Sequence, residues 1–264
     1  MMQKTSLTAQ RLFAWLVAGT CIVAHAIALT LASSGIVLAA VVASVSTLIA
    51  ALAYTILVPR GRLRHLHFLI VPVFLLLAQW FFVMTLQLIG AQHLIWWSVG
   101  ITALYIGIYT YVLNLYIHIR PRYQAHALEN ITSYINVVCL FFTATSLYAL
   151  QIFINAPAWV VMVTGTAVVA VLTYAIMWVS DIVFSTCWRY IVLVSLLMLE
   201  VITVMTFLPI TVFARGAIVA IMYYALVGIV RNQLLRIHGP AVIRRYAVIT
   251  AFALALILLT ADWI

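Results

Sequence analysis

Glu200 is the acidic residue in this sequence with the clearest chemical potential, because it lies inside a long apolar stretch. Arg189 marks the start of that stretch, and a helical rise of about 1.5 Å per residue places Glu200 roughly 16 Å inside it. No Lys or Arg lies at that depth in any predicted span, so the carboxyl group is expected to be protonated and to donate a hydrogen bond. Two roles remain open: proton coupling or solute binding, and a buried acid that only ties helices together.

A second set of polar residues flanks the basic turn at residues 119–123. Before the turn, Tyr111, Asn114 and His118 fall on one side of a helix at about 100° per residue. After it, a polar stripe about four turns long consists of Glu129, Thr132, Asn136, Cys139, Thr143 and Ser146. The two helices should pack side by side, with Asn114 or His118 as the expected partner of Asn136. Their polar edges would then form interhelical hydrogen bonds or a solute or proton path.

Arginines gather in the turns between apolar segments. Those predicted to contact anionic lipid headgroups are Arg60, Arg62, Arg64, Arg120, Arg122, Arg244 and Arg245. The alternative is a phosphate-bearing substrate, held by the arginines of the turns near residues 62 and 122, with a nearby histidine as acid or base. That alternative requires several turns to converge.

Common catalytic motifs are missing from the sequence. It has no P-loop, GxGxxG, HExxH, GxSxG or CxxC pattern, and its four acidic residues form no paired-carboxylate constellation. The cysteines Cys21, Cys139 and Cys187 have no pairing pattern and are predicted to be buried small hydrophobes. We therefore expect no catalytic residue, cofactor or metal site, and the sequence leans away from an enzyme.

Composition defines the class of protein. The 264 residues are 68% hydrophobic and 6% charged, and the mean hydropathy is +1.26. A chain of this size cannot hide so much apolar surface in a soluble core, so a bilayer has to cover it. We predict an all-α, multi-pass cell-membrane protein that forms a single integral membrane domain over residues 1–264, without a soluble domain.

Hydropathy divides the chain into about nine spans, with eight as the alternative. The spans are Leu12–Ala32, Ile36–Val58, Phe68–Gly90, Ile95–Ile119, Ile131–Ile154, Trp159–Ser180, Tyr190–Leu208, Ala217–Val230 and Tyr246–Trp263. With the N-terminus in the cytoplasm and the C-terminus outside, every one of the 13 Lys and Arg residues except Arg215 falls on the inner side. The high pI of about 9.8 therefore reflects membrane topology, and no nucleic-acid partner is expected.

Three functions fit these features. The first is a small transporter of a solute or protons that uses Glu200 and the polar hairpin. The second is a non-catalytic structural or assembly subunit of a larger membrane complex, for which short loops and no catalytic motif are equally suited. The third is a membrane enzyme acting on lipid headgroups. The expected partners are the lipid bilayer, its anionic headgroups and other membrane-protein subunits.

Overall fold

The computed structural model describes residues 12, 14–23, 26, 67–118, 126–235 and 240–261. These ranges contain seven helices that are long and apolar enough to cross a membrane, together with a shorter apolar helix, Ala14–Val23. The long helices are α3 (Ile70–Ile89), α4 (Gln92–His118), α5 (Ala127–Phe153), α6 (Ala158–Val179), α7 (Phe184–Phe207), α8 (Val212–Leu234) and α9 (Pro240–Thr260). The described ranges contain no strand. This architecture is consistent with a helical membrane bundle.

The seven long helices correspond to the third through ninth predicted spans. The first predicted span, Leu12–Ala32, overlaps the short helix Ala14–Val23, and the second, Ile36–Val58, lies outside the described residues. The helical membrane class is therefore found in the structure. A total of nine spans and the sidedness of the chain stay predictions.

Several helices are longer than hydropathy predicted, and α7 and α8 are examples. Helix α7 begins at Phe184, before the predicted start at Tyr190, and Arg189 lies within it with its guanidinium 5.6 Å from the centre of the Trp188 ring. Helix α8 spans Val212–Leu234, where the prediction was Ala217–Val230. Thr211 caps α8 by accepting a hydrogen bond from the Ala214 N–H. Charged residues lowered the hydropathy at these ends, but they do not break the helical backbone.

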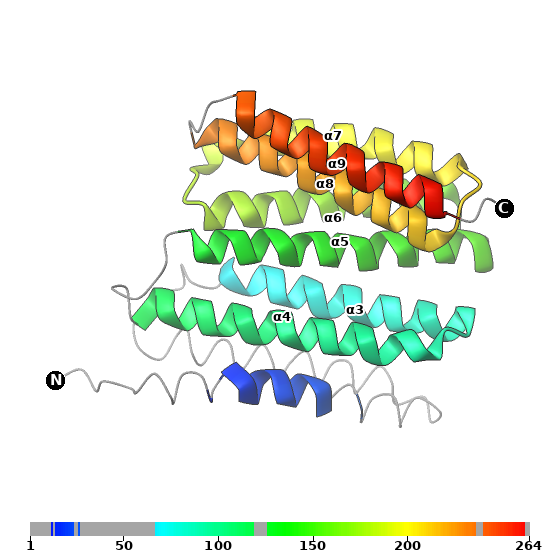
Figure 1. Ribbon diagram of the computed structural model, residues 1–264, viewed down its shortest axis with the longest axis horizontal. Helices are drawn as coiled ribbons and strands as arrows, with labels where there is room; N and C mark the ends of the chain where they lie inside the picture. Colours follow the sequence, from blue (N-terminus) through cyan, green and yellow to red (C-terminus); the bar gives the residue numbers. More distant parts are fainter. Residues whose placement is uncertain are drawn as a thin grey trace. The chain divides into compact units, whose positions relative to one another are not determined.

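The chain folds as two compact units, Met1–Ile135 and Asn136–Ile264, and the boundary falls within α5. In the first unit α3 packs against α4, and Figure 1 shows this antiparallel pair in cyan and green. The Tyr109 hydroxyl of α4 donates a hydrogen bond of 2.8 Å to the Phe68 carbonyl just before α3. A tyrosine hydroxyl thus satisfies one of the backbone groups that hydrocarbon would leave unpaired. The prediction of one continuous membrane domain stays a prediction.

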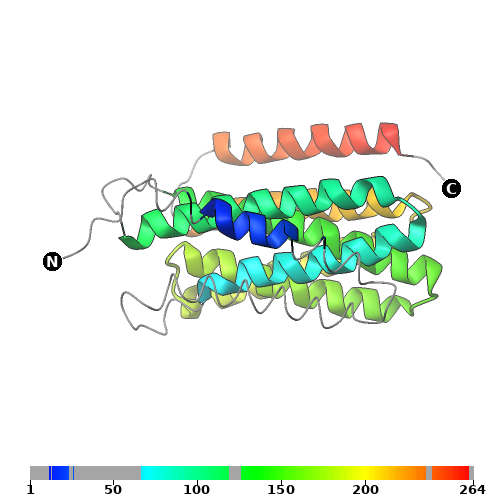
Figure 2. The ribbon, with the colours of Figure 1, turned by 90° about the horizontal axis from the view of Figure 1, so that it is seen from below.

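In the second unit, successive helices pack against each other. Helix α6 contacts α7, α7 contacts α8, and α8 contacts α9. Figure 2 shows α9 as the outermost helix of this unit. Its side chains are correspondingly exposed, with Phe252 at 70% and Leu259 at 84%. Helix α9 therefore presents a broad apolar surface to its surroundings.

A close helix contact in the second unit joins α8 to α5. Gly216 of α8 lies against Thr145 of α5, and a Cβ added to Gly216 would overlap the Thr145 hydroxyl and lie 3.0 Å from the Thr145 backbone nitrogen. Contacts of this kind are typical of membrane helices, where small residues let backbones approach each other. Gly216 thus fixes the distance between α5 and α8 near the residues of the candidate site.

Candidate functional site

A buried polar network joins α3 and α4. The Gln79 amide nitrogen donates to the Ser98 hydroxyl at 2.9 Å, and the Thr102 hydroxyl donates to the Gln79 amide oxygen at 2.9 Å. Ser98 in turn donates to the Ile95 carbonyl at 2.7 Å. Each of these side chains has a partner, so the network is suited to holding two helices together rather than to binding a ligand. Sequence reasoning missed it, although Ser98 and Thr102 share a helix face.

Replacing Gln79 with Leu is expected to lower the free energy of unfolding by about 1–2 kcal/mol, because two interhelical hydrogen bonds are lost. Unfolding in mixed SDS micelles measures this difference. The matched control is Gln87→Leu on the same helix, where the side chain is exposed and the stability should not change. Equal stability of both variants would show that the Gln79 bonds contribute nothing.

The interior of the second unit contains a polar cluster around Asn136, which is 1% exposed. Its amide nitrogen donates a hydrogen bond of 3.0 Å to the Leu172 carbonyl of α6. Its amide oxygen is buried without a hydrogen-bond partner among the described residues, and so is the Tyr223 hydroxyl. The side chains of Asn136 and Thr173 lie near the Tyr223 hydroxyl. The cluster therefore joins α5, α6 and α8 through uncharged polar groups.

The structure confirms the prediction that Asn136 bonds to a neighbouring helix, but its recorded partner is a backbone carbonyl and not Asn114 or His118. A carbonyl is available on any helix, so sequence spacing could not single it out. Asn114 is buried within the first unit, and the side chain of His118 lies outside the described residues. The meeting of the two polar edges stays a prediction.

Two other hydroxyls of the polar stripe on α5 bond locally, whereas the Thr132 hydroxyl is buried without a hydrogen-bond partner among the described residues. Thr143 and Ser146 donate to the carbonyls of Cys139 and Phe142, one turn earlier on their own helix, at 2.9 and 2.7 Å. Glu129 lies in the first turn of α5, 2.8 Å from the His126 ring, at an end of the helix where a negative charge is favourable. A role of Glu129 in binding a solute or a proton stays a prediction.

Glu200 lies on the exposed side of α7. It is the seventeenth residue of the helix, so it lies about 24 Å from the first residue and about 10 Å from the last. The exposed residues around it are apolar: Leu193, Leu196, Leu197, Val204 and Phe207. Thr203, one turn further along the helix, donates to the Leu199 carbonyl at 2.7 Å. Among the described residues, none makes a hydrogen bond or ion pair with Glu200.

The seven arginines predicted to contact lipid are only partly described. Arg244 and Arg245 are exposed near the start of α9, as a headgroup-facing role requires. Arg60, Arg62, Arg64, Arg120 and Arg122 lie outside the described residues. Convergence of the basic turns into a phosphate-binding site therefore stays a prediction.

Sequence reasoning missed a buried cation. Arg215, in the first turns of α8, is only 8% exposed. Its Nε donates to the Ile210 carbonyl at 3.0 Å, and its guanidinium lies 5.7 Å from the centre of the Tyr148 ring. Tyr148 is itself held by a hydrogen bond of 3.0 Å to the Ile202 carbonyl. The sequence did contain one sign that Arg215 is unusual. It is the one Lys or Arg residue that the predicted topology places on the outer side.

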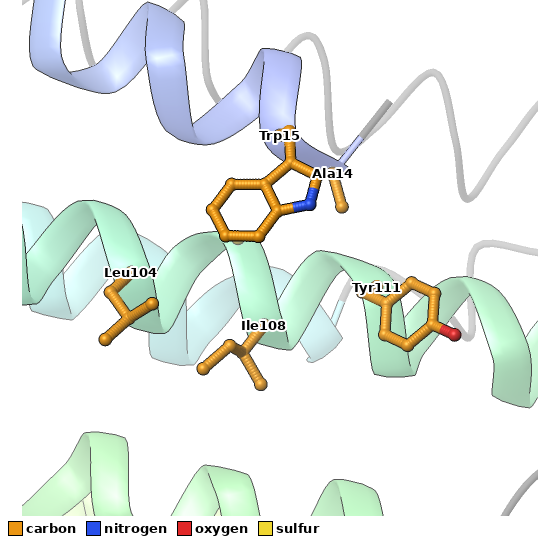
Figure 3. A pocket seen from close by; sticks show the side chains of 6 residues that line it. Ala14, Trp15, Leu104, Ile108 and Tyr111 are labelled. Carbon is orange, nitrogen blue, oxygen red and sulfur yellow. The ribbon is translucent and has the colours of Figure 1, made fainter. Parts of the chain in front are cut away.

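The first unit has an apolar pocket of about 340 Å³ between the short helix and α4. Figure 3 shows Trp15 of the short helix above α4, which contributes Leu104, Ile108 and Tyr111. The polar groups of these side chains are the Trp15 N–H and the Tyr111 hydroxyl. None of the described residues that line the pocket is charged, so this lining suits a hydrocarbon chain better than an ion.

Metal and thiol chemistry have little support in the described part of the chain. No three His, Cys, Asp or Glu residues there come together as metal ligands. Cys21, Cys139 and Cys187 are buried free thiols, as predicted.

The seven long apolar helices and the uncharged polar networks of the described residues are consistent with a helical membrane bundle. Comparisons with protein-family models, characterised proteins and solved structures find no match for the chain.

Proposed function

We propose that this protein is a non-catalytic subunit of a larger integral membrane complex, and that the exposed face of α7 around Glu200 binds a partner. The observation that carries the proposal is Glu200 itself, an exposed carboxyl group among apolar side chains in a membrane-length helix. A charged side chain facing lipid inside the hydrocarbon core costs up to about 3 kcal/mol. A partner that neutralises the carboxylate removes this cost.

The partner that best fits this face is a transmembrane helix with a Lys or Arg opposite Glu200. Among the described residues, no cation makes an ion pair with Glu200: Arg215 is buried and engaged, and Arg189 lies eleven residues away on α7. Leu196 and Val204, each 55% exposed, lie one turn on either side of Glu200 and supply apolar contact area. A transport role would need Glu200 to face an internal path, and its exposed position gives that role less support.

Photocrosslinking in the native membrane tests this proposal. A crosslinking amino acid at position 196 or 204 is expected to capture one transmembrane partner, whereas position 163 on the exposed side of α6 should not. Glu200→Leu should reduce the adduct by at least about tenfold, because the carboxylate gains several kcal/mol from a desolvated ion pair. Glu200→Gln keeps the shape of the side chain but removes its charge, so its adduct yield shows whether the charge is needed for binding.

The most specific test of this proposal exchanges the charges of Glu200 and its partner residue. The crosslinked segment of the partner should contain a Lys or Arg, and changing it to Glu should restore binding to the Glu200→Lys variant but not to the original chain. Adducts only with lipid, with a second copy or with residues 36–58 of the same chain would overturn the proposal. A Glu200→Leu variant that keeps full adduct yield would do the same.

A further inference from the structure

Arg215 is a buried cation without an anionic partner in the described part of the chain. The ion pair found there joins His126 to Glu129, far from Arg215 in sequence and in the other unit. Glu200 makes no hydrogen bond or ion pair with Arg215 and is exposed on α7. Burying a guanidinium without a counter-charge is unfavourable, so its surroundings should either supply an anion or leave a place for one.

The contacts of Arg215 leave both Nη groups of its guanidinium available. Nε is used by the Ile210 carbonyl, and the planar group lies over the Tyr148 ring. Neither Nη bonds to a described residue, and neither is among the buried unpaired atoms, so both reach the molecular surface. Two Nη groups offer a planar set of N–H donors, which matches two oxygens of a phosphate better than a single halide ion.

The position along the helices also fits a phosphate. Arg215 is the fourth residue of α8, beside the turn that follows α7. The ends of membrane-spanning helices lie near the lipid headgroups, at the depth of the phosphate layer. Tyr148 is held by Ile202, and Thr206 donates to the same carbonyl at 2.8 Å, so the surface under the guanidinium is fixed by bonds between α5 and α7.

We propose that Arg215, stacked on Tyr148, forms an oxyanion site that binds a phosphate group at this end of the second unit. Two sources share this chemistry, a phospholipid headgroup and a free phosphate ion. The site depends on Arg215 and its neighbours and is independent of the proposed partner surface around Glu200.

Two binding experiments on the full chain separate these sources. In detergent without added lipid, inorganic phosphate is compared with chloride at equal ionic strength, with thermal stabilisation as the readout. In a second experiment, native mass spectrometry compares retention of phosphatidic acid with retention of diacylglycerol of the same chains. Stabilisation by phosphate indicates a free-ion site, and selective retention of phosphatidic acid indicates a headgroup site.

Three variants assign the binding to Arg215. Arg215→Gln should weaken binding of whichever probe the wild type binds by about tenfold or more. Arg215→Lys should bind with an affinity between this variant and wild type, because it keeps the charge but loses the planar set of guanidinium donors. Arg189→Gln is the matched control, since Arg189 also lies over an aromatic ring but is exposed. If Arg215→Gln does not fold, the Lys variant still tests the planar set of donors. Wild-type protein that binds neither probe, or an effect equal in Arg189→Gln, would overturn the proposal.

Discussion

Gly216→Ala is expected to lower the free energy of unfolding by about 3 kcal/mol, at the upper end of the effects of overpacking. The added methyl group overlaps Thr145, and the Thr145 backbone nitrogen lies only 3.0 Å from the new Cβ. A side chain could rotate away, but backbone cannot, so α5 and α8 must move apart. Unfolding in mixed SDS micelles measures the loss.

Gly100→Ala is the matched control for this substitution. Gly100 is also helical, and a Cβ there has no atom within 4 Å, so the change should be neutral or slightly stabilising. Thr145→Ala in the Gly216→Ala background should recover part of the loss, because it removes the hydroxyl but leaves the backbone contact. A Gly216→Ala variant as stable as wild type would contradict the close approach of α5 and α8.

Asn136→Asp is expected to cost about 4 kcal/mol of unfolding free energy at pH 7. Asn136 is 1% exposed, and its amide donates to the Leu172 carbonyl. A carboxylate cannot donate there and cannot remain charged in the interior, so the variant must take up a proton to fold. Its unfolding free energy should therefore fall by roughly 1.4 kcal/mol per pH unit above about pH 4, where the unfolded carboxyl group titrates.

Unfolding of Asn136→Asp over a range of pH distinguishes the cost of burying a charged carboxylate from a simple loss of packing. Near pH 4 the protonated acid can donate to the Leu172 carbonyl, and stability should approach that of wild type. Asn130→Asp, an exposed change in the first turn of the same helix, should have little effect at any pH, because a negative charge is favourable there. A pH-independent loss in Asn136→Asp would show that the site is accessible to water.

Hydropathy alone was enough to find the long helices, and its errors have a simple cause. Averaging over a window places a helix end where charged residues begin, so Arg189 moved the predicted start of α7 and Arg215 that of α8. The backbone follows hydrogen bonds and caps such as Thr211, which hydropathy does not measure. Element existence was therefore predicted well and element boundaries poorly.

The candidate sites, too, were predicted from the sequence only in part. The sequence indicated that Asn136 would bond across helices, since an unpaired amide in hydrocarbon is costly in any fold, and that Glu200 lies within a span. It could not determine that Asn136 meets a carbonyl of α6, because every helix presents the same backbone groups. The Gln79 network and the stacking of Arg215 on Tyr148 likewise join residues far apart in the chain.

The sequence by itself determined that this chain is a helical membrane protein, because its composition requires a bilayer and hydrocarbon requires internally bonded helices. Only the tertiary structure decided which face each polar residue occupies. It buried Asn136 and Arg215 and left Glu200 exposed on α7. The physical reason is that an apolar helix in a membrane has hydrophobic residues on every side, so its hydropathy pattern does not say which side contacts other helices.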